Sequence, residues 1–512
     1  MKRYIILSVL ALLSLSSCDK FLTEVPQDSL TDKNAFTSAA DAEALVNSCY
    51  DGLQKGFEEY YTWYYLVISE CLSDNAYSGG DDVDIINVFK RDITPLNLVV
   101  TKSWKSMYGG ILRCNVVLSA IPEIDDPVLD EISFGEITRR EEMLGEAAFL
   151  RALHYYNLVR LWGDVPLVTS TGSTEPEDVE VPRSPAEKIY GQILSDLEFA
   201  STRLPEGRAT EAESRGLATL GAVWTLYAKT YAIMGAPDNV DWDSVRTYTE
   251  KVLASDRYSL LQEFDWLYDN QHRNNSETIL AVQYEGNGST EGNYVPAMLL
   301  PPSMTEQNWR KYLTPSQDLI AAFDEQGDEV RKNATIIYED VNNMWYDEFY
   351  AVQENGSWST RTIPFPYKSR GFDRVGWDCS DLIYIFRLAD VVLLHAEALN
   401  HISGPETAAA DPDLQMLRTR IGLEPLQASS KDEMTELLLK ERRLELAYEG
   451  ERFNDLKRYG LLEKVLSEYS WEEIVFGEKV TKSRTFPHYM QYLPIPQDER
   501  DRNPELTQNE GY

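Results

Sequence analysis

The sequence predicts a mainly α-helical fold that packs against an irregular, loop-rich region with a few short strands. The first observation is a 3.6-residue period of apolar side chains between positions 139 and 162, which is typical of a helix. The second is the recurrence of small side chains along one side of residues 215–235. The third is a long segment, about 255–380, in which Asn, Gly, Pro and aromatic residues rise and helical periodicity fades.

The apolar pattern predicts these helices in chain order: Ala40–Leu53, Tyr60–Leu72, Ser103–Ile121, Arg139–Trp162, Pro185–Thr202, Arg215–Gly235, Leu382–Asn400 and Asp432–Tyr459. Gly163 is expected to end the fourth helix. Ser184 is expected to cap the fifth, with Pro185 at its first helical position. Gly450 is expected to divide the last range into two helices. Thr278–Tyr284 alternates like a short strand.

One of these helices carries a short repeat motif. The stretch Leu217-x-x-Leu220-Gly221-x-x-Trp224 resembles the first half of a tetratricopeptide repeat, with Leu and Trp in place of Trp and Tyr. Small residues on the same helix would let a second helix approach closely. Because the intervals between helices are unequal, we expect tetratricopeptide-like helix pairs in a degenerate array.

The first eighteen residues predict export and membrane attachment. Lys2 and Arg3 precede an apolar stretch, residues 5–13, that is too short to span a bilayer. The stretch Leu15-Ser16-Ser17-Cys18 resembles a lipobox, which predicts a lipoprotein signal peptide at 1–17 and lipid attachment at Cys18. Acyl chains anchor a protein because each buried methylene contributes about 0.8 kcal/mol. The alternative is a secreted protein that is cleaved elsewhere.

Strong acidity excludes several classes of partner. Loss of Lys2 and Arg3 with the signal lowers the formal net charge from −36 to −38. Nucleic-acid binding needs Lys and Arg to displace counterions from phosphates, so nucleic acid is not an expected partner. Attachment to the membrane is expected through the lipid anchor only, because the chain would repel anionic lipid.

The cysteines and histidines predict no metal centre and no cofactor. Cys49, Cys71, Cys114 and Cys379 match no metal-ligand spacing and are too few for a disulfide scaffold. Export would permit disulfides, and buried free thiols are at least as good an interpretation. The five histidines form no His-x-x-x-His or Cys/His cluster. A calcium ion held by Asp81–Asp84 remains an open alternative.

Five further segments, in order along the chain, carry a recognisable pattern. They are residues 145–156 (GEAAFLRALHYY), 161–167 (LWGDVPL), 384–400 (YIFRLADVVLLHAEALN), 440–459 (KERRLELAYEGERFNDLKRY) and 493–496 (LPIP). Together with the lipobox, this pattern resembles the SusD/RagB family of outer-membrane lipoproteins from Bacteroidetes. The resemblance covers essentially the whole chain.

The resemblance implies one SusD-like domain over 18–512, with an N-terminal part at about 19–235, a loop-rich excursion at about 255–380 and a C-terminal part at about 381–512. It implies a lipid-anchored protein at the cell outer membrane that faces the cell exterior. It also implies a non-catalytic role: the protein would capture oligosaccharides and deliver them to a SusC-like TonB-dependent transporter. RagB-like members leave open an alternative, the capture of peptides or glycoprotein fragments.

The charged residues within these segments are expected to be structural. Arg151, Glu441, Arg442, Arg443 and Glu445 lie near apolar helical faces. Removing one partner of a buried ion pair destabilises a protein by several kcal/mol because a charge is left unpaired. The shared motifs therefore predict ion pairs of the scaffold, and the ligand site is expected elsewhere.

A sugar site needs an aromatic ring against the apolar face of the sugar and planar polar side chains for its hydroxyls. Two regions offer this mixture. In the first, Tyr77 is the expected platform, with Asn75, Asp81 and Asp82 as polar partners; the alternative is a surface turn. In the second, which spans residues 284–358, the candidates are Tyr284, Tyr294, Trp309, Trp345, Tyr346 and Trp358, some of which are expected in the core.

Two other classes of function stay open. A glycosidase would need two carboxylates about 5–10 Å apart in a cleft, and no motif singles out such a pair among the 84 Asp and Glu residues. A pure interaction scaffold is the other, because tetratricopeptide-like arrays often bind proteins.

Overall fold

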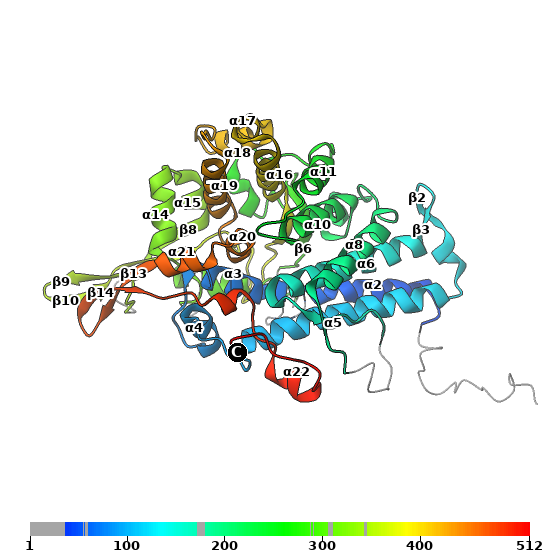
Figure 1. Ribbon diagram of the computed structural model, residues 1–512, viewed down its shortest axis with the longest axis horizontal. Coiled ribbons are helices and arrows are strands. Elements are labelled where there is room, and N and C mark those ends of the chain that lie inside the picture. Colours follow the sequence, from blue (N-terminus) through cyan, green and yellow to red (C-terminus); the bar gives the residue numbers. More distant parts are fainter. Residues whose placement is uncertain are drawn as a thin grey trace, which may run out of the picture.

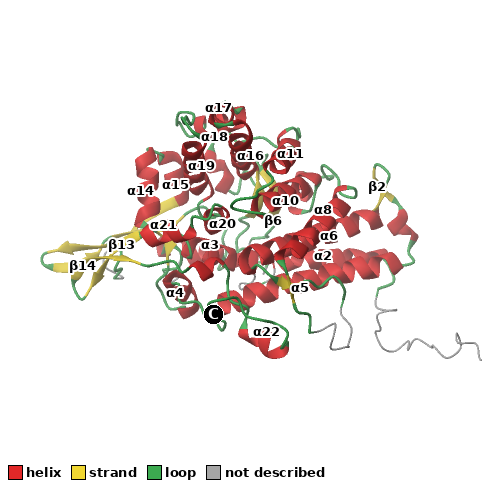
Figure 2. Cartoon of the chain, viewed as in Figure 1, coloured by secondary structure: helices red, strands yellow, loops and turns green. Residues whose placement is uncertain are grey.

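The computed structural model describes residues 36–54, 56, 60–171, 180–286, 288–289, 291–305, 311–341 and 346–512. The predicted signal peptide and Cys18 lie outside the described residues. Helices dominate the described part, and each of its strands belongs to a two-stranded antiparallel ladder (Figure 2). The predicted mainly α fold with a few short strands is therefore confirmed.

The first half of the chain forms a group of long helices (Figure 1). α6 (Arg139–Trp162) packs against both α5 (Leu98–Ala120) and α8 (Ala186–Ser201), and α2 (Ala39–Gln54) packs against α5. The other elements here are η2 (Tyr60–Tyr64, a π-helix), α3 (Tyr65–Cys71), α4 (Val83–Lys90), η3 (Ile121–Glu123), η4 (Pro127–Asp130), α9 (Glu211–Gly216), α10 (Leu220–Ile233) and α11 (Trp242–Leu253).

The second half of the chain continues the array of helix pairs. α11 packs against both α10 and α16 (Leu388–Ser403), and α16 packs against α19 (Lys431–Leu446). The remaining helices are η5 (Phe264–Tyr268), α12 (Val295–Leu299), α13 (Pro302–Thr305), α14 (Gln317–Gln326), α15 (Glu329–Thr335), α17 (Pro405–Ala409), α18 (Pro412–Thr419), α20 (Arg452–Arg458), α21 (Leu462–Glu468), η6 (His488–Gln491) and α22 (Gln497–Arg502).

The strands are short and pair locally or across long stretches of chain. The pairs are β1 (Ala76–Tyr77) with β7 (Thr314–Pro315), β2 (Ile132–Phe134) with β3 (Ile137–Thr138), β4 (Val165–Pro166) with β5 (Arg183–Ser184), β6 (Thr278–Val282) with β12 (Ile383–Arg387), β8 (Ile336–Asp340) with β11 (Thr362–Pro366), β9 (Ala351–Glu354) with β10 (Ser357–Thr360), and β13 (Ser470–Val475) with β14 (Glu478–Ser483). The β9–β10 and β13–β14 hairpins project together from one end of the molecule (Figure 1).

The structure confirms the most periodic helix at both predicted ends. α6 begins with a capping box, in which Thr138 accepts a hydrogen bond from the Glu141 backbone and Glu141 accepts one from that of Thr138. It ends at Gly163, whose φ of 73° favours glycine. The C-terminal segment covers this end, because Trp162 Nε1 donates to the Pro494 carbonyl at 2.9 Å.

Several predicted boundaries were wrong. The helix expected from Ser103 begins at Leu98, where the Asn97 side chain caps it. Residues 215–235 form two helices, since Leu217 and Thr219 have extended backbones between α9 and α10. The helix expected from Leu382 begins only at position 388, because the β-branched and aromatic residues before it pair with β6 as strand β12. Ser184 lies in strand β5, and Asp164 Oδ1 accepts the Ala186 N–H at the start of α8 in its place.

The predicted structural ion pairs are confirmed. Arg151 binds Asp196 at 2.6 Å, and the carboxylate of Glu445, which is fully buried, accepts from three guanidiniums. Those guanidiniums belong to Arg331 at 3.1 Å, Arg387 at 2.7 Å and Arg420 at 2.8 Å. The other predicted residues bind as follows: Glu441 with Arg331 and Arg418, Arg442 with Asp390 and Asp455, and Arg443 with Asp318.

Replacement of Glu445 by Ala should lower the free energy of unfolding by about 3–5 kcal/mol, because three buried guanidiniums lose their counter-charge. The matched control is Glu325→Ala, which breaks an exposed pair with Lys440 and should change stability by less than about 1 kcal/mol. Urea denaturation at pH 7 measures both variants. Equal effects would contradict the assignment.

The same carboxylate predicts a pH dependence. Burial opposes ionisation of Glu445, but the three guanidiniums outweigh it and hold its pKa below the usual value. A depressed folded-state pKa stabilises the protein above the pKa of the unfolded chain, and that stabilisation is lost as pH falls. Wild-type stability should therefore decrease from pH 5 downward more steeply than that of Glu445→Ala.

Candidate functional site

The structure brings the two regions predicted to hold the ligand side by side. Strand β1 pairs with β7, so that Tyr77 lies opposite Thr314. Beyond the strands, the Gly79 N–H donates to the Lys311 carbonyl at 3.0 Å. The Tyr312 hydroxyl donates to Asp81 Oδ1 at 2.6 Å. Residues far apart in sequence thus form one loop surface.

Tyr77 belongs to the core and not to that surface. Its side chain is 2% exposed, its ring stacks on Phe349 with centroids 3.8 Å apart, and its hydroxyl donates to Asp347 Oδ2 at 2.6 Å. The sequence prediction of an exposed platform is corrected on this point. The reason is the short strand, which turns the ring inward against residues some 270 positions later.

Asn75 and Asp82 also have structural partners. Asn75 is fully buried, donates from Nδ2 to Glu70 Oε2 at 2.8 Å and accepts from Arg443 Nε at 2.9 Å. Asp82 caps α4 by accepting from two backbone N–H groups, those of Asp84 and Ile85. Of the first predicted set, Asp81 is the exposed residue that lies at the surface.

The partner segment has an unusual backbone just before strand β7. Lys311 and Leu313 have φ values of 58° and 52°, in the left-handed region that non-glycine residues rarely adopt. Such strain of order 1–3 kcal/mol persists where surrounding contacts impose it, and it gathers at functional sites. Here the Lys311 ammonium contacts Asp347 Oδ2 at 2.9 Å and the Tyr346 carbonyl at 2.9 Å.

Of the second predicted set, Tyr346 is 49% exposed and can offer a ring face. Trp309 and Trp345 lie outside the described residues. Trp358 lies on β10 and is partly buried, and its Nε1 donates to the Gly477 carbonyl at 2.6 Å. It therefore fastens the two projecting hairpins to each other, and only part of its ring remains open to a ligand.

The sequence prediction missed a loop, residues 371–378, that exposes three large apolar side chains. Phe372 and Val375 are each 52% exposed and Trp377 is 37% exposed. Reciprocal backbone hydrogen bonds between Val375 and Asp378, at 2.8 and 3.2 Å, make its tip a tight turn. The Gly376-Trp377-Asp378 sequence carries the signal, an aromatic residue among turn formers, that singled out Trp358.

The base of the same loop contains three side chains that could hold a cation. Atoms of Asp373, Cys379 and Asp381 lie within 4.8 Å of one another. Each already has a protein partner: Asp373 accepts from the Ser380 N–H at 3.0 Å, Asp381 from the Gly371 N–H at 2.8 Å, and Cys379 donates to the Asn293 carbonyl at 3.2 Å. These hydrogen bonds explain the cluster of three side chains as part of the structure of the loop.

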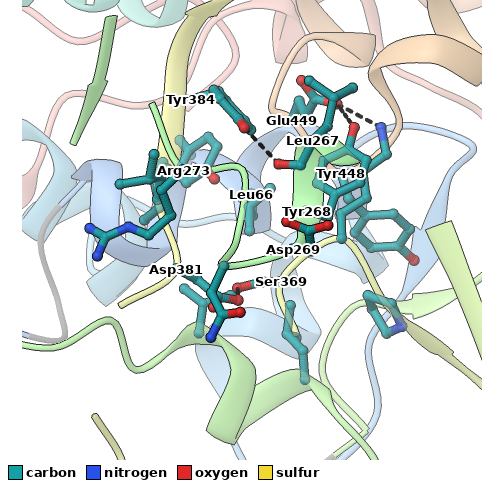
Figure 3. A pocket seen from close by; sticks show the side chains of 18 residues that line it. Leu66, Leu267, Tyr268, Asp269, Arg273, Ser369, Asp381, Tyr384, Tyr448 and Glu449 are labelled. Atoms are coloured by element: carbon teal, nitrogen blue, oxygen red, sulfur yellow. Dashed lines mark hydrogen bonds and ion pairs between the residues drawn. The ribbon is translucent and has the colours of Figure 1, made fainter. Parts of the chain in front are cut away.

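An enclosed pocket lies behind this surface, between α3, η5 and β12 (Figure 3). Its polar groups bond one another: Tyr268 Oη and Lys368 Nζ both donate to Glu449 Oε1, at 2.9 and 2.6 Å, and Tyr384 Oη donates to the Leu267 carbonyl at 2.6 Å. Its volume is about 60 Å³. Pockets that bury organic ligands measure about 300–1,000 Å³, so this pocket is too small for an oligosaccharide. Two larger hollows, of about 680 and 670 Å³, lie beside α9 and β6 and between α14, α19 and α21.

The four cysteines that the structure describes, Cys49, Cys71, Cys114 and Cys379, are free and buried. Of the two alternatives left open by the sequence, the structure therefore contains free thiols. In the described part of the chain, no helix combines the length and the apolar character needed to cross a membrane.

The fold and the loop surface define a class of protein: a helical-repeat scaffold that presents irregular loops on one side. Residues 276–512 match the SusD family, and residues 20–231 match the family described as "Starch-binding associating with outer membrane". The chain belongs to the SusD family.

Curated relatives are similar along most of the chain. The SusD-like protein P38 of Formosa agariphila is 27% identical over 479 residues, which cover 87% of this chain and 88% of the relative. The starch-binding protein SusD of Bacteroides thetaiotaomicron is 26% identical over 421 residues, 72% of each chain. The solved structure of a laminarin binding SusD-like protein has a TM-score of 0.71 and 26% identity, and the match covers 93% of this chain and 100% of that one.

Replacement of Tyr77 by Ala should lower the free energy of unfolding by about 3 kcal/mol or more, because a buried ring and its hydrogen bond to Asp347 are removed. The matched control is Tyr346→Ala, which removes an exposed tyrosine from the same surface and should leave the thermal midpoint nearly unchanged. A stable Tyr77→Ala protein would return Tyr77 to the list of surface candidates.

Proposed function

We propose that this protein is a cell-surface glycan-binding lipoprotein that captures oligosaccharides and delivers them to a SusC-like TonB-dependent transporter. The observation that carries the proposal is the hydrogen-bonded loop at 371–378, in which Phe372 and Trp377 are partly exposed to solvent. Exposed rings on a preformed loop suit the apolar faces of sugars, because little ordering is left to oppose binding. Relatives named for binding starch and laminarin support this class of ligand.

The proposal gives the protein a binding role and not a catalytic one. The enclosed pocket is too small for a sugar chain, and its carboxylate Glu449 is bound to Lys368 and Arg387. An open surface with aromatic and polar side chains favours capture and release. The outer-membrane association described for the matching family supports a location at the cell surface.

Simultaneous replacement of Phe372 and Trp377 by Ala should weaken glycan binding roughly tenfold or more, because two ring faces are lost. The protein without residues 1–18 would first be screened on a glycan array, and the affinity for the best glycan would then be measured by calorimetry. The matched control is Met416→Ala, which removes an exposed apolar side chain from α18.

Equal affinity of the double variant and the wild type would remove this loop from the site. If no glycan binds to the wild type while peptides do, the alternative role in peptide capture is supported instead. Turnover of an oligosaccharide by the pure protein would support a glycosidase.

Replacement of Cys18 by Ala should release the protein from the outer-membrane fraction, because the acyl chains would have no attachment point. Membrane fractionation and mass spectrometry of the N-terminal peptide measure the outcome. Cys71→Ser, which alters a buried thiol of α3, is the control and should leave the location unchanged. Retention of Cys18→Ala in the membrane would contradict the lipid anchor and point to the barrel partner as the anchor.

A further inference from the structure

The loop that joins α3 to β1 is held from below by two arginines. Arg452 makes two hydrogen bonds, each 2.8 Å long, to the carboxylate of Asp74. Arg443 donates to the Asp74 carbonyl at 3.0 Å and to Asn75 Oδ1 at 2.9 Å. Both loop residues are buried. The loop therefore takes its position from α19 and α20, which carry the arginines.

The amide of Asn75 can adopt only one orientation. A guanidinium donates and never accepts, so the oxygen of Asn75 must face Arg443. The amide nitrogen then faces Glu70 Oε2 at 2.8 Å. The second oxygen of Glu70 accepts from the Gly450 N–H at 3.2 Å. Both oxygens of Glu70 thus accept hydrogen bonds, which suits an ionised carboxylate because that form has no donor of its own.

The surroundings of Glu70 oppose that ionised state. The residue is fully buried, and burial raises its pKa to about 7, against the hydrogen bonds from Asn75 and Gly450. The charge of Lys368, whose ammonium bonds Glu449, favours the ionised form. Neutral titratable groups also face Glu70: the partly buried Tyr65 and the buried Cys71 and Tyr448.

We propose that Glu70 is a protonation-sensitive positioning residue for the ligand surface and acts through Asn75 and Arg443. A proton on Glu70 Oε2 would set an O–H donor against the Asn75 N–H, and that hydrogen bond would be lost. Beyond Asn75, the Ser316 N–H donates to the Asn75 carbonyl at 2.8 Å, and β1 pairs with β7. A less ordered Asn75 would therefore also affect the two segments of the ligand surface, which contain Asp81 and Lys311.

The effect of Glu70 on ligand affinity depends on the proposed glycan site, but its effect on loop order can be tested without a glycan. The folded-state pKa of Glu70 lies above the unfolded value of about 4.3, so folding favours the protonated form. The stabilisation from protonated Glu70 is therefore complete below about pH 4 and is lost as the pH rises through about 7. The order of the loop at Asn75 should instead increase as the pH rises, because the ionised form accepts the hydrogen bond from Asn75. If Glu70 had a structural role only, global stability and loop order would change with pH in the same direction.

Hydrogen exchange of the protein without residues 1–18 tests the proposal in the absence of glycan. After correction for intrinsic rates, the peptide over residues 72–82 should exchange about fivefold faster at pH 6 than at pH 8, the factor expected from one lost hydrogen bond. Glu70→Gln should remove this difference, while the control Glu325→Gln, an exposed carboxylate, should keep it. If Glu70→Gln does not fold, Asn75→Ala should remove the difference with Glu70 intact.

Glycan affinity measured at the same two pH values gives the second readout. It should fall at pH 6 in the wild type and in Glu325→Gln, and stay constant in Glu70→Gln. A wild-type loop that exchanges equally at both pH values, or a difference that persists in Glu70→Gln, overturns the proposal. If no glycan binds, the glycan-capture role fails, while the exchange data still decide on Glu70.

Discussion

The rest of the structure depends on the buried ion pairs of α19. Glu445 collects guanidiniums from α15, β12 and the end of α18, and Arg442, one helical turn earlier, binds carboxylates of α16 and α20. A buried charge has no alternative partner in an apolar core, so each pair fixes one register between two elements. One charged helix thus places five neighbouring elements around itself.

These pairs also set the position of the loops that face the ligand. Arg443 and Arg452 follow Arg442 on α19 and α20, and they hold Asp74 at the root of the first loop. Burial opposes ionisation of Asp74, but the two guanidiniums hold its pKa well below the usual value. The network of buried ion pairs therefore extends from α19 to Asp74, which lies beneath the candidate ligand surface. Replacing Arg443 or Arg452 in the shared motif would therefore remove contacts that position the loop at Asp74.

The helices and their ion pairs could be predicted from the sequence because both are local or strongly constrained. The period in residues 139–162 and the charges of residues 440–459 depend on side chains whose environments follow from helical spacing. β12 could not be predicted, because its apolar run is continuous with that of α16 and only its pairing with β6 makes it a strand. The two segments predicted to hold a ligand lie side by side, but the buried environments of Tyr77 and Asn75 within them could not be predicted.

Tyr77 and Trp377 show why. Tyr77 is buried because Phe349, some 270 positions later in the sequence, covers its ring, whereas Trp377 lies within the local turn at Val375–Asp378 and stays partly exposed. The turn formers around Trp377 are a local signal, but nothing near Tyr77 in the sequence indicates that Phe349 will cover it.

The placement of charge also limits the ligand. Arginine is concentrated inside, where residues such as Arg331, Arg387 and Arg442 are almost fully buried and neutralise buried carboxylates. The formal net charge of −36 shows that carboxylates far outnumber the lysines and arginines of the chain. A polysaccharide that bears sulfate or uronate groups would approach against this field, whereas an uncharged glycan would not. Phe372, Val375 and Trp377 would attract such a glycan through contacts that charge does not weaken. If the proposed glycan-binding role holds, the charge of the chain favours an uncharged sugar chain as the ligand.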